Sequence, residues 1–295
     1  MERIICLDNA ATSFPKPAVV HETAHTFHET GGVNPGRAGY DTALGAEQMI
    51  QGVRKSLSEF FNPSLYASGK DPNRLVFIRN AAMSLNLIIN GTVKAGAMPI
   101  DMTESNISLL AVTGHEGLLA QSRTGGIRLA DDAEIEGTIY GGTGVHSAYS
   151  HHLTEFPYRL EAGTLNLAGI SAGLGWFEER GVEEIHRHEL DLLGKLQDGL
   201  REIKGVKLWG TERLDRRVAT MSVTVDTFDA EDVGTILDVE YGIQTRTGLH
   251  CAPLIHEHYG TVPRGTVRFS CGPFNNERHI EIAVKAMAEI AADRN

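Results

Sequence analysis

Only three cysteines occur in the 295 residues, Cys6, Cys251 and Cys271, and they lie far apart in the sequence. An odd number of widely spaced cysteines makes neither a disulfide framework nor a zinc knuckle. No stretch has the long uncharged apolar run that a membrane helix needs. The first residues, MERIICLDNAATSFP, lack the basic and then apolar layout of a secretory signal. We therefore expect a cytoplasmic protein in which any functional cysteine acts as a free thiol.

Basic residues are scarce compared with acidic ones: 27 lysines and arginines face 38 aspartates and glutamates, for a formal net charge of −11. A surface of this charge repels nucleic acid and anionic lipid, so we expect neither as a partner. Three histidines, His21, His25 and His28, have the spacing of one helix face and could in principle bind zinc or nickel. Because no carboxylate or cysteine is clearly assigned to complete the set, we predict no metal site.

The 32 glycines are spread through short turn signals, which is typical of alternating strands, loops and helices. Apolar spacing predicts helices over residues 17–30, 42–61, 230–242 and 275–294, and one or two helices over 167–203. It predicts strands at residues 74–78, 109–114, 205–210, 218–225, 243–248 and 265–272. The last helix is expected to begin at Asn275 or Asn276. Little reads as a confident element between residues 91 and 108.

The segment RTGLHCAP, residues 246–253, points to thiol chemistry. A strand delivers Arg246, a glycine opens the loop, and His250 stands beside Cys251. Cationic neighbours favour the reactive thiolate form of a cysteine. We therefore predict an exposed functional thiol at Cys251, whereas Cys6 and Cys271 lie in apolar strands and are expected to be buried.

Several other turns and strand ends carry polar groups. Arg268, in VRFSCGPFN, could hold a substrate carboxylate if a site faces it. The turns GGTG at 141–144 and EAGTLN at 161–166 could hold a phosphate through backbone N–H groups and hydroxyls. The turn TGHEG, residues 113–117, presents the carboxylate of Glu116. Each of these signals is weak when taken alone.

Taken in order, the motifs resemble one family. The series reads LDNAATSFPKP, NPGRAGYD, FIRNAAMSLNL, TGHEGLL, GGTG, LEAGTLNLAGI, RTGLHCAPL and GTVRFSCGPFN. It is similar to the cysteine desulfurases and selenocysteine lyases of the class V aminotransferase group, which are pyridoxal-phosphate enzymes of the type I fold. The resemblance implies a homodimer that takes sulfur from L-cysteine, leaves alanine and holds the sulfur as a persulfide on a loop cysteine. An acceptor protein for that sulfur is then a further expected partner.

The resemblance assigns roles to single positions. Cys251 matches the persulfide cysteine. The predicted cofactor-binding residues are Thr113 and His115, at the phosphate, and Thr143, which would reach the phosphate of the neighbouring subunit. The predicted substrate-binding residues are Asn9, Arg246 and Arg268, of which Arg268 matches the arginine that pairs with the substrate carboxylate.

The sequence also departs from the family pattern. Glu116 stands where the family has the lysine that links covalently to the cofactor, and a carboxylate cannot form that bond. Ala82 replaces a phosphate-binding threonine, and AQSRTG at 120–125 replaces a glycine-rich loop. At 95–102, VKAG runs directly into AMPIDM, so about three strand–helix units of roughly 30 residues each are missing. These units would supply the aspartate for the pyridinium nitrogen and the histidine that stacks on the ring.

We therefore expect a type I-like α/β fold with two domains. Residues 1–160 would form a reduced large domain with a mostly parallel sheet, and residues 161–295 a small α+β domain. Covalent cofactor binding is predicted to be lost and desulfurase activity to be impaired or absent. The alternative is a non-catalytic dimerisation or sulfur-relay partner that uses Cys251. Two further readings stay open, namely Glu116 acting as a general base beside His115, and a copy without a selected activity.

Overall fold

The computed structural model gives the fold of the chain in two compact units. The structure describes residues 4–33, 40–61, 71–78, 99–105, 107–122, 124–136, 154–158, 160, 167–226 and 228–293. The central unit comprises Lys16–Val182, and the terminal unit combines Met1–Pro15 with Glu183–Asn295. The sequence predicted one boundary after residue 160. That boundary stays a prediction.

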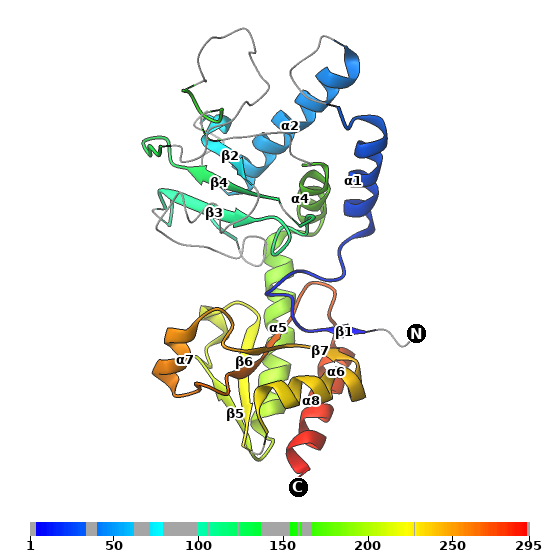
Figure 1. The fold of residues 1–295 in the computed structure, drawn as a ribbon, viewed down its shortest axis with the longest axis vertical. Helices are drawn as coiled ribbons and strands as arrows, with labels where there is room; N and C mark the ends of the chain where they lie inside the picture. The colour runs from blue at the N-terminus through cyan, green and yellow to red at the C-terminus, as the bar shows by residue number, and fades with distance from the viewer. Residues whose placement is uncertain are drawn as a thin grey trace. The chain divides into compact units, whose positions relative to one another are not determined.

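The central unit contains a small sheet with helices beside it (Figure 1). Its elements are α1 (Ala18–Thr30), α2 (Asp41–Phe60), the 3-10 turn η2 (Pro72–Arg74), β2 (Leu75–Ile78), β3 (Leu109–Thr113), β4 (Gly125–Leu129) and α4 (Ala168–Arg180). Leu57 of α2 and Leu174 of α4 pack with Phe77 and Leu110 on one face of the sheet. Val76 and Ile127 are buried on the other face. A sheet covered on both faces is typical of α/β folds.

The sheet of the central unit has the order β2-β4-β3, and both of its ladders are antiparallel. β2 and β3 consequently run in the same direction, with β4 reversed between them. The expectation of a mostly parallel sheet therefore does not hold for the described strands here. The reason is the short connection from β3 to β4, which is too short for a crossover and returns the chain as an antiparallel neighbour.

The terminal unit is built around a four-stranded antiparallel sheet of order β5-β6-β9-β8 (Figure 1). Its elements are β1 (Ile5–Cys6), α5 (Val182–Arg201), β5 (Val206–Trp209), η3 (Leu214–Arg216), β6 (Thr220–Val225), α6 (Ala230–Tyr241), β7 (Ile243–Gln244), β8 (Arg246–Gly248), α7 (Pro253–Tyr259), β9 (Thr266–Ser270) and α8 (Glu277–Ala292). β1 and β7 form a separate parallel pair.

The core of the terminal unit lies between this sheet and its helices. Alternate residues of β6, including Met221 and Val223, are buried with Leu196 of α5, Val233 of α6 and Met287 of α8. This period of two is typical of a strand with one buried face, and the strand predicted at residues 218–225 is confirmed. Among the described helices of the chain, none combines the length and apolar character needed to cross a membrane.

The ends of two predicted elements can be compared directly. The last helix begins after Asn276, whose side chain accepts a hydrogen bond from the backbone N–H of His279 at 3.1 Å. This N-cap confirms the predicted helix start. The short helix α7 was not predicted, because seven residues rich in histidine give too little apolar periodicity.

A buried amide network fixes the N-terminal segment to β9. The Asn9 side chain, 2% exposed, donates to the carbonyls of Cys6 and Ser270 and to Asn275 Oδ1, each at 3.2 Å. Asn9 Oδ1 accepts from the Phe14 N–H at 3.1 Å. A Cβ added at Gly272 would lie 2.5 Å from Asn9 Cγ, so only glycine allows this approach. The network therefore holds segments about 260 residues apart in one arrangement.

We predict that Asn9→Ala lowers the free energy of unfolding by about 3 kcal/mol, because several buried polar groups lose their partner at once. The control is Asn276→Ala, which removes one exposed cap and is expected to cost about 1 kcal/mol. Urea unfolding measures both changes. Equal losses in the two variants would show that the Asn9 network contributes no more than an ordinary helix cap.

Candidate functional site

The turn that carries Glu116 follows directly from β3. Gly114 N–H donates to the Thr124 carbonyl and Ala120 N–H to the Gly114 carbonyl, both at 2.8 Å, so the loop is closed at its base. A Cβ at Gly114 would lie 2.2 Å from Thr124 Oγ1, which makes glycine necessary here. Thr113, at the end of β3, is 6% exposed, whereas His115 and Glu116 are partly exposed. The turn therefore presents His115 and Glu116 together at a strand end.

Lys16 reaches the same turn, and sequence reasoning missed it. Its Nζ donates to the carbonyl of His115 at 3.0 Å. Burial lowers the pKa of Lys16 from 10.5 to about 8, because a charged ammonium is less stable away from water. The residue stands in the quoted motif LDNAATSFPKP, but nothing in its spacing along the chain connects it with residue 115.

At the position that the resemblance assigns to the family's lysine, Glu116 supplies a carboxylate, which cannot form the covalent link to pyridoxal phosphate. The loss of that link stays a prediction. The other predicted cofactor residue, Thr143, lies outside the described residues, as do Ala82, both glycine–threonine turns and residues 95–98 of the junction. Thr113 and His115 are placed at the turn, but their predicted contacts with a phosphate stay predictions.

The loop after β8 presents Cys251 in the terminal unit. His250 and Cys251 have φ angles of 51° and 60°, a left-handed conformation that costs non-glycine residues about 1–2 kcal/mol each. The backbones of Gly248 and Gly265 approach so closely that a Cβ on Gly265 would lie 2.5 Å from Gly248. This contact closes the loop at its base. The thiol of Cys251 is exposed, as predicted, and Cys271 is buried as predicted.

One arginine contacts the exposed thiol, and a second lies opposite it in the neighbouring strand. Arg246 Nη2 donates to Cys251 Sγ at 3.4 Å, a distance that suits a sulfur acceptor. Arg246 lies directly opposite Arg268 in the β8–β9 ladder, so the two guanidinium groups share one face of the sheet. Arg268 Nη2 in turn donates to Asp8 Oδ1 at 2.8 Å. The structure thus brings together three predicted residues, Arg246, Cys251 and Arg268, and adds Asp8, which was not predicted.

His250 is held next to this group as a neutral side chain. Its Nε2 lies 2.9 Å from Thr266 Oγ1, and its ring packs 5.4 Å from the ring of His256. Burial, followed by the positive charge of Arg268, lowers the pKa of His250 from 6.5 to about 4. His250 therefore adds no positive charge to the loop near neutral pH.

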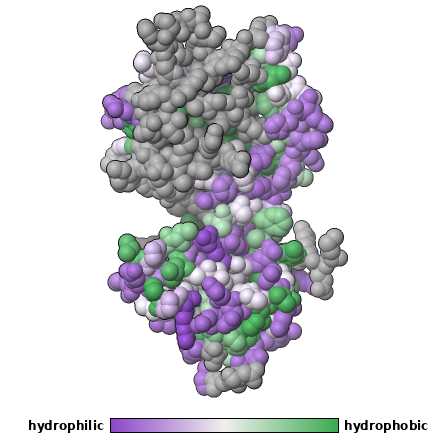
Figure 2. Space-filling model, viewed as in Figure 1, coloured by the Kyte–Doolittle hydropathy of each residue, from purple (hydrophilic) through white to green (hydrophobic). Residues whose placement is uncertain are grey.

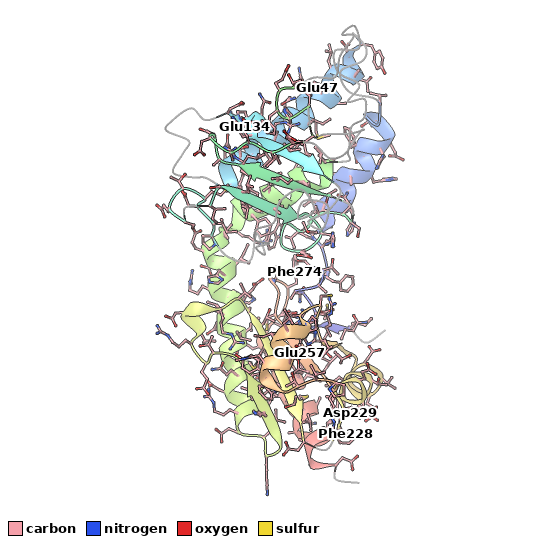
Figure 3. The ribbon with its side chains drawn as sticks, turned by 60° about the vertical axis from the view of Figure 1, so that its left-hand side comes forward. Glu47, Glu134, Phe228, Asp229, Glu257 and Phe274 are labelled. Atoms are coloured by element: carbon pink, nitrogen blue, oxygen red, sulfur yellow. The ribbon has the colours of Figure 1, made fainter. Side chains whose placement is uncertain are left out.

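The surroundings of the loop are partly apolar. α7 follows Cys251 immediately and exposes Leu254, Ile255 and Tyr259. Figure 2 shows hydrophobic residues at the surface where α7 lies in Figure 1, and Figure 3 labels Glu257 on this helix.

Cys6 is only partly buried, and burial raises the pKa of its thiol. Among the described residues, no three His, Cys, Asp or Glu side chains are grouped so that they could hold a metal ion.

Asn9, the third predicted substrate-binding residue, lies in the same unit as the arginines. Its amide is buried, and the hydrogen bonds described above go to protein groups. Its neighbour Asp8 carries the polar group that reaches Arg268. A substrate contact of Asn9 stays a prediction.

Comparison with known proteins identifies relatives of this chain. A family model described as aminotransferase class-V matches residues 5–97 and 91–282. A probable cysteine desulfurase of Methanothermobacter thermautotrophicus is 29% identical over 212 residues, covering 69% of this chain and 52% of the relative. One from Xylella fastidiosa is 29% identical over 213 residues, covering 70% and 50%. In these alignments the chain spans about half the length of the curated relatives it matches.

Two further matches extend over nearly the whole chain. A cysteine desulfurase of Cronobacter sakazakii is 24% identical over 389 residues, covering 96% of this chain and 92% of the relative. The apo structure of a cysteine desulfurase from Thermococcus onnurineus superposes with a TM-score of 0.87 at 22% identity, covering 98% of this chain and 94% of that one. This likeness confirms the predicted fold class.

We predict that His250 makes the protein less stable as the pH falls from about 6.5 towards 4. In this window the unfolded chain binds a proton that folded His250 excludes, so protonation favours unfolding. Urea midpoints at pH 7.5 and pH 5 should therefore differ more for the wild type than for His250→Asn, since asparagine tolerates positive φ. Equal pH dependence in the two proteins would contradict this role of His250.

Proposed function

Because the chain belongs to the aminotransferase class V family, we propose that it is a cysteine desulfurase-like protein that retains the sulfur-carrying cysteine while carbon–sulfur cleavage is impaired or absent. The observation that carries this proposal is the contrast between two positions. Cys251 is exposed and accepts a hydrogen bond from Arg246, whereas Glu116 offers a carboxylate where the family lysine stands.

The Cys251 loop suits sulfur transfer from another persulfide. The thiolate of Cys251 would attack the terminal sulfur of the donor persulfide. One sulfur–sulfur bond forms on Cys251, the donor's bond breaks, and the donor leaves as a thiolate. Arg246 stabilises the attacking thiolate through a charge-assisted hydrogen bond. The exposure of Cys251 allows a donor to approach. This transfer requires no covalently linked cofactor.

The same residues support the alternative, a non-catalytic sulfur-relay or dimerisation partner. It differs from an impaired desulfurase only in whether any residual release of sulfur from L-cysteine remains. The homodimer, the acceptor protein and the cytoplasmic location stay predictions, as do the domain boundary at residue 160 and the family roles of Asn9, Thr113, His115 and Thr143. Pyridoxal phosphate is the family's cofactor by resemblance, and we propose that its covalent link through residue 116 is lost.

We predict that Cys251 accepts sulfur from an active cysteine desulfurase supplied with L-cysteine. The protein should gain the mass of one sulfur atom at Cys251, and Cys251→Ser should gain none there. Arg246→Gln should slow the transfer about fivefold, because the thiolate loses a charged donor. Intact-mass and peptide mass spectrometry measure these changes. Failure of the folded wild type to gain sulfur would contradict the acceptor role.

We also predict that pyridoxal phosphate leaves no covalent label on the wild type after borohydride reduction. Peptide mapping should include Lys16, because its amine, with a pKa of about 8, lies at the Glu116 turn. Glu116→Lys should retain the label at residue 116 if the phosphate-binding groups are intact, and Glu116→Gln is the control that lacks an amine. Stable labelling of a single lysine in the wild type would contradict the loss of covalent binding.

A further inference from the structure

Asp8 forms an ion pair with Arg268, the arginine that the family resemblance assigns to binding the substrate carboxylate. The Arg268 guanidinium and the Asp8 carboxylate are 2.8 Å apart, and their side chains are 13% and 27% exposed. Asp8 follows β1 and bridges Ser270 at the end of β9, so the backbone itself brings the pair together. The Asn9 network described above fixes this register. The ion pair is therefore built into the fold.

The ion pair lies next to a second positive charge. Arg246 and Arg268 are cross-strand partners, and like charges in such positions repel one another. Asp8 offsets the charge of Arg268, and Cys251 Sγ accepts from Arg246. Arg268 Nε is buried and has no hydrogen-bond partner in the part of the chain that the structure describes. Asp8 thus already reduces the attraction of Arg268 for anions.

The groups around Asp8 favour its ion pair with Arg268. Asp8 lies on the wall of a cavity of about 750 Å³ between the N-terminal segment, α6 and the β7–β8 strands. Two further carboxylates, those of Glu231 and Asp238, line this cavity, and none of the described residues that line it is basic. A carboxylate that turned from Arg268 into the cavity would meet like charges, which repel it.

We propose that Asp8 is a specificity-determining residue, an internal carboxylate that competes for Arg268 and so weakens the preference of the Cys251 site for small carboxylate-bearing thiols and disulfides. The inference rests on the proposed function of Cys251 and on the predicted role of Arg268 in binding the carboxylate of a ligand at that thiol. An incoming carboxylate must share Arg268 with Asp8 or displace it. Removing the charge of Asp8 strengthens the attraction of Arg268 for that carboxylate.

The test compares two disulfides that differ in carboxylates. Cystine carries them and cystamine does not, while both carry amines. The Cys251 thiolate attacks one sulfur, a mixed disulfide forms, and the other half leaves as a thiolate, so no external oxidant is needed. Mass spectrometry of the Cys251 peptide gives the rate with each compound, and the ratio of the two rates reports carboxylate preference. The measurement uses the full chain and does not require that Cys251 accept sulfur.

Asp8→Asn, which is isosteric, should raise the cystine-to-cystamine rate ratio about fivefold, the size expected for a partly exposed ion pair. Arg268→Gln should lower the ratio, and adding Asp8→Asn to Arg268→Gln should then have no effect. The matched control is Asp229→Asn. It removes the same charge from an exposed pair with Arg264, 2.9 Å apart in the same unit, and should leave the ratio unchanged (Asp229 is labelled in Figure 3).

An unchanged or lowered ratio in folded Asp8→Asn would overturn the competition between Asp8 and the ligand. Asp8→Ser is the second variant if Asp8→Asn unfolds. If Arg268→Gln lowers the ratio but neither Asp8 variant raises it, the inference about Asp8 fails and the carboxylate site stands. If Arg268→Gln leaves the ratio unchanged, Arg268 does not bind the carboxylate, which counts against both the inference and the substrate site proposed from the family.

Discussion

The hydrogen bonds of the Asn9 amide fix the N-terminal segment against the end of β9, and the candidate thiol site depends on this constraint. Asn9 and Asn275 share a hydrogen bond, and both amides donate to the Cys6 carbonyl, while Asn275 Oδ1 also accepts from the Gly272 N–H. With these groups paired, the register of residue 8 against Ser270 is set. The carboxylate of Asp8 then reaches Arg268, whose strand neighbour Arg246 faces the thiol of Cys251.

This arrangement places Cys251, Arg246, Arg268 and Asp8 in one unit of the structure. The loop is closed at its base by Gly248 and Gly265, the thiol is exposed, and its charged donor comes from the adjoining strand. The Glu116 turn is closed at its base by the backbone hydrogen bonds of Gly114, and the loss of the family's covalent chemistry there is our proposal. The Cys251 loop and the Glu116 turn can both form in one chain, because each is stabilised by local contacts within its own unit.

The sequence predicted those parts of the fold whose signals are local. The strand β6 and the Asn276 cap of α8 follow from neighbouring residues, and both are confirmed. The strand β4 was missed. Its sequence, GGIRL, has two glycines of low strand propensity, and packing on both faces determines its conformation. The antiparallel insertion of β4 between β2 and β3 is likewise set by the tertiary fold rather than by any periodicity.

The residues of the candidate site also fall into two groups, those with a signal in the local sequence and those brought in by the tertiary fold. Arg246, His250 and Cys251 could be identified because they lie within six residues of one another, and Arg268 because it matches a family motif. Asp8 and Lys16 could not be identified, since their partners Arg268 and His115 are remote in sequence and no spacing rule connects them.

The most direct test of the account is to quantify alanine formed from L-cysteine by the purified protein with added pyridoxal phosphate. The account predicts little or no alanine above a protein-free control, whereas catalytic turnover to alanine that requires Cys251 would contradict it.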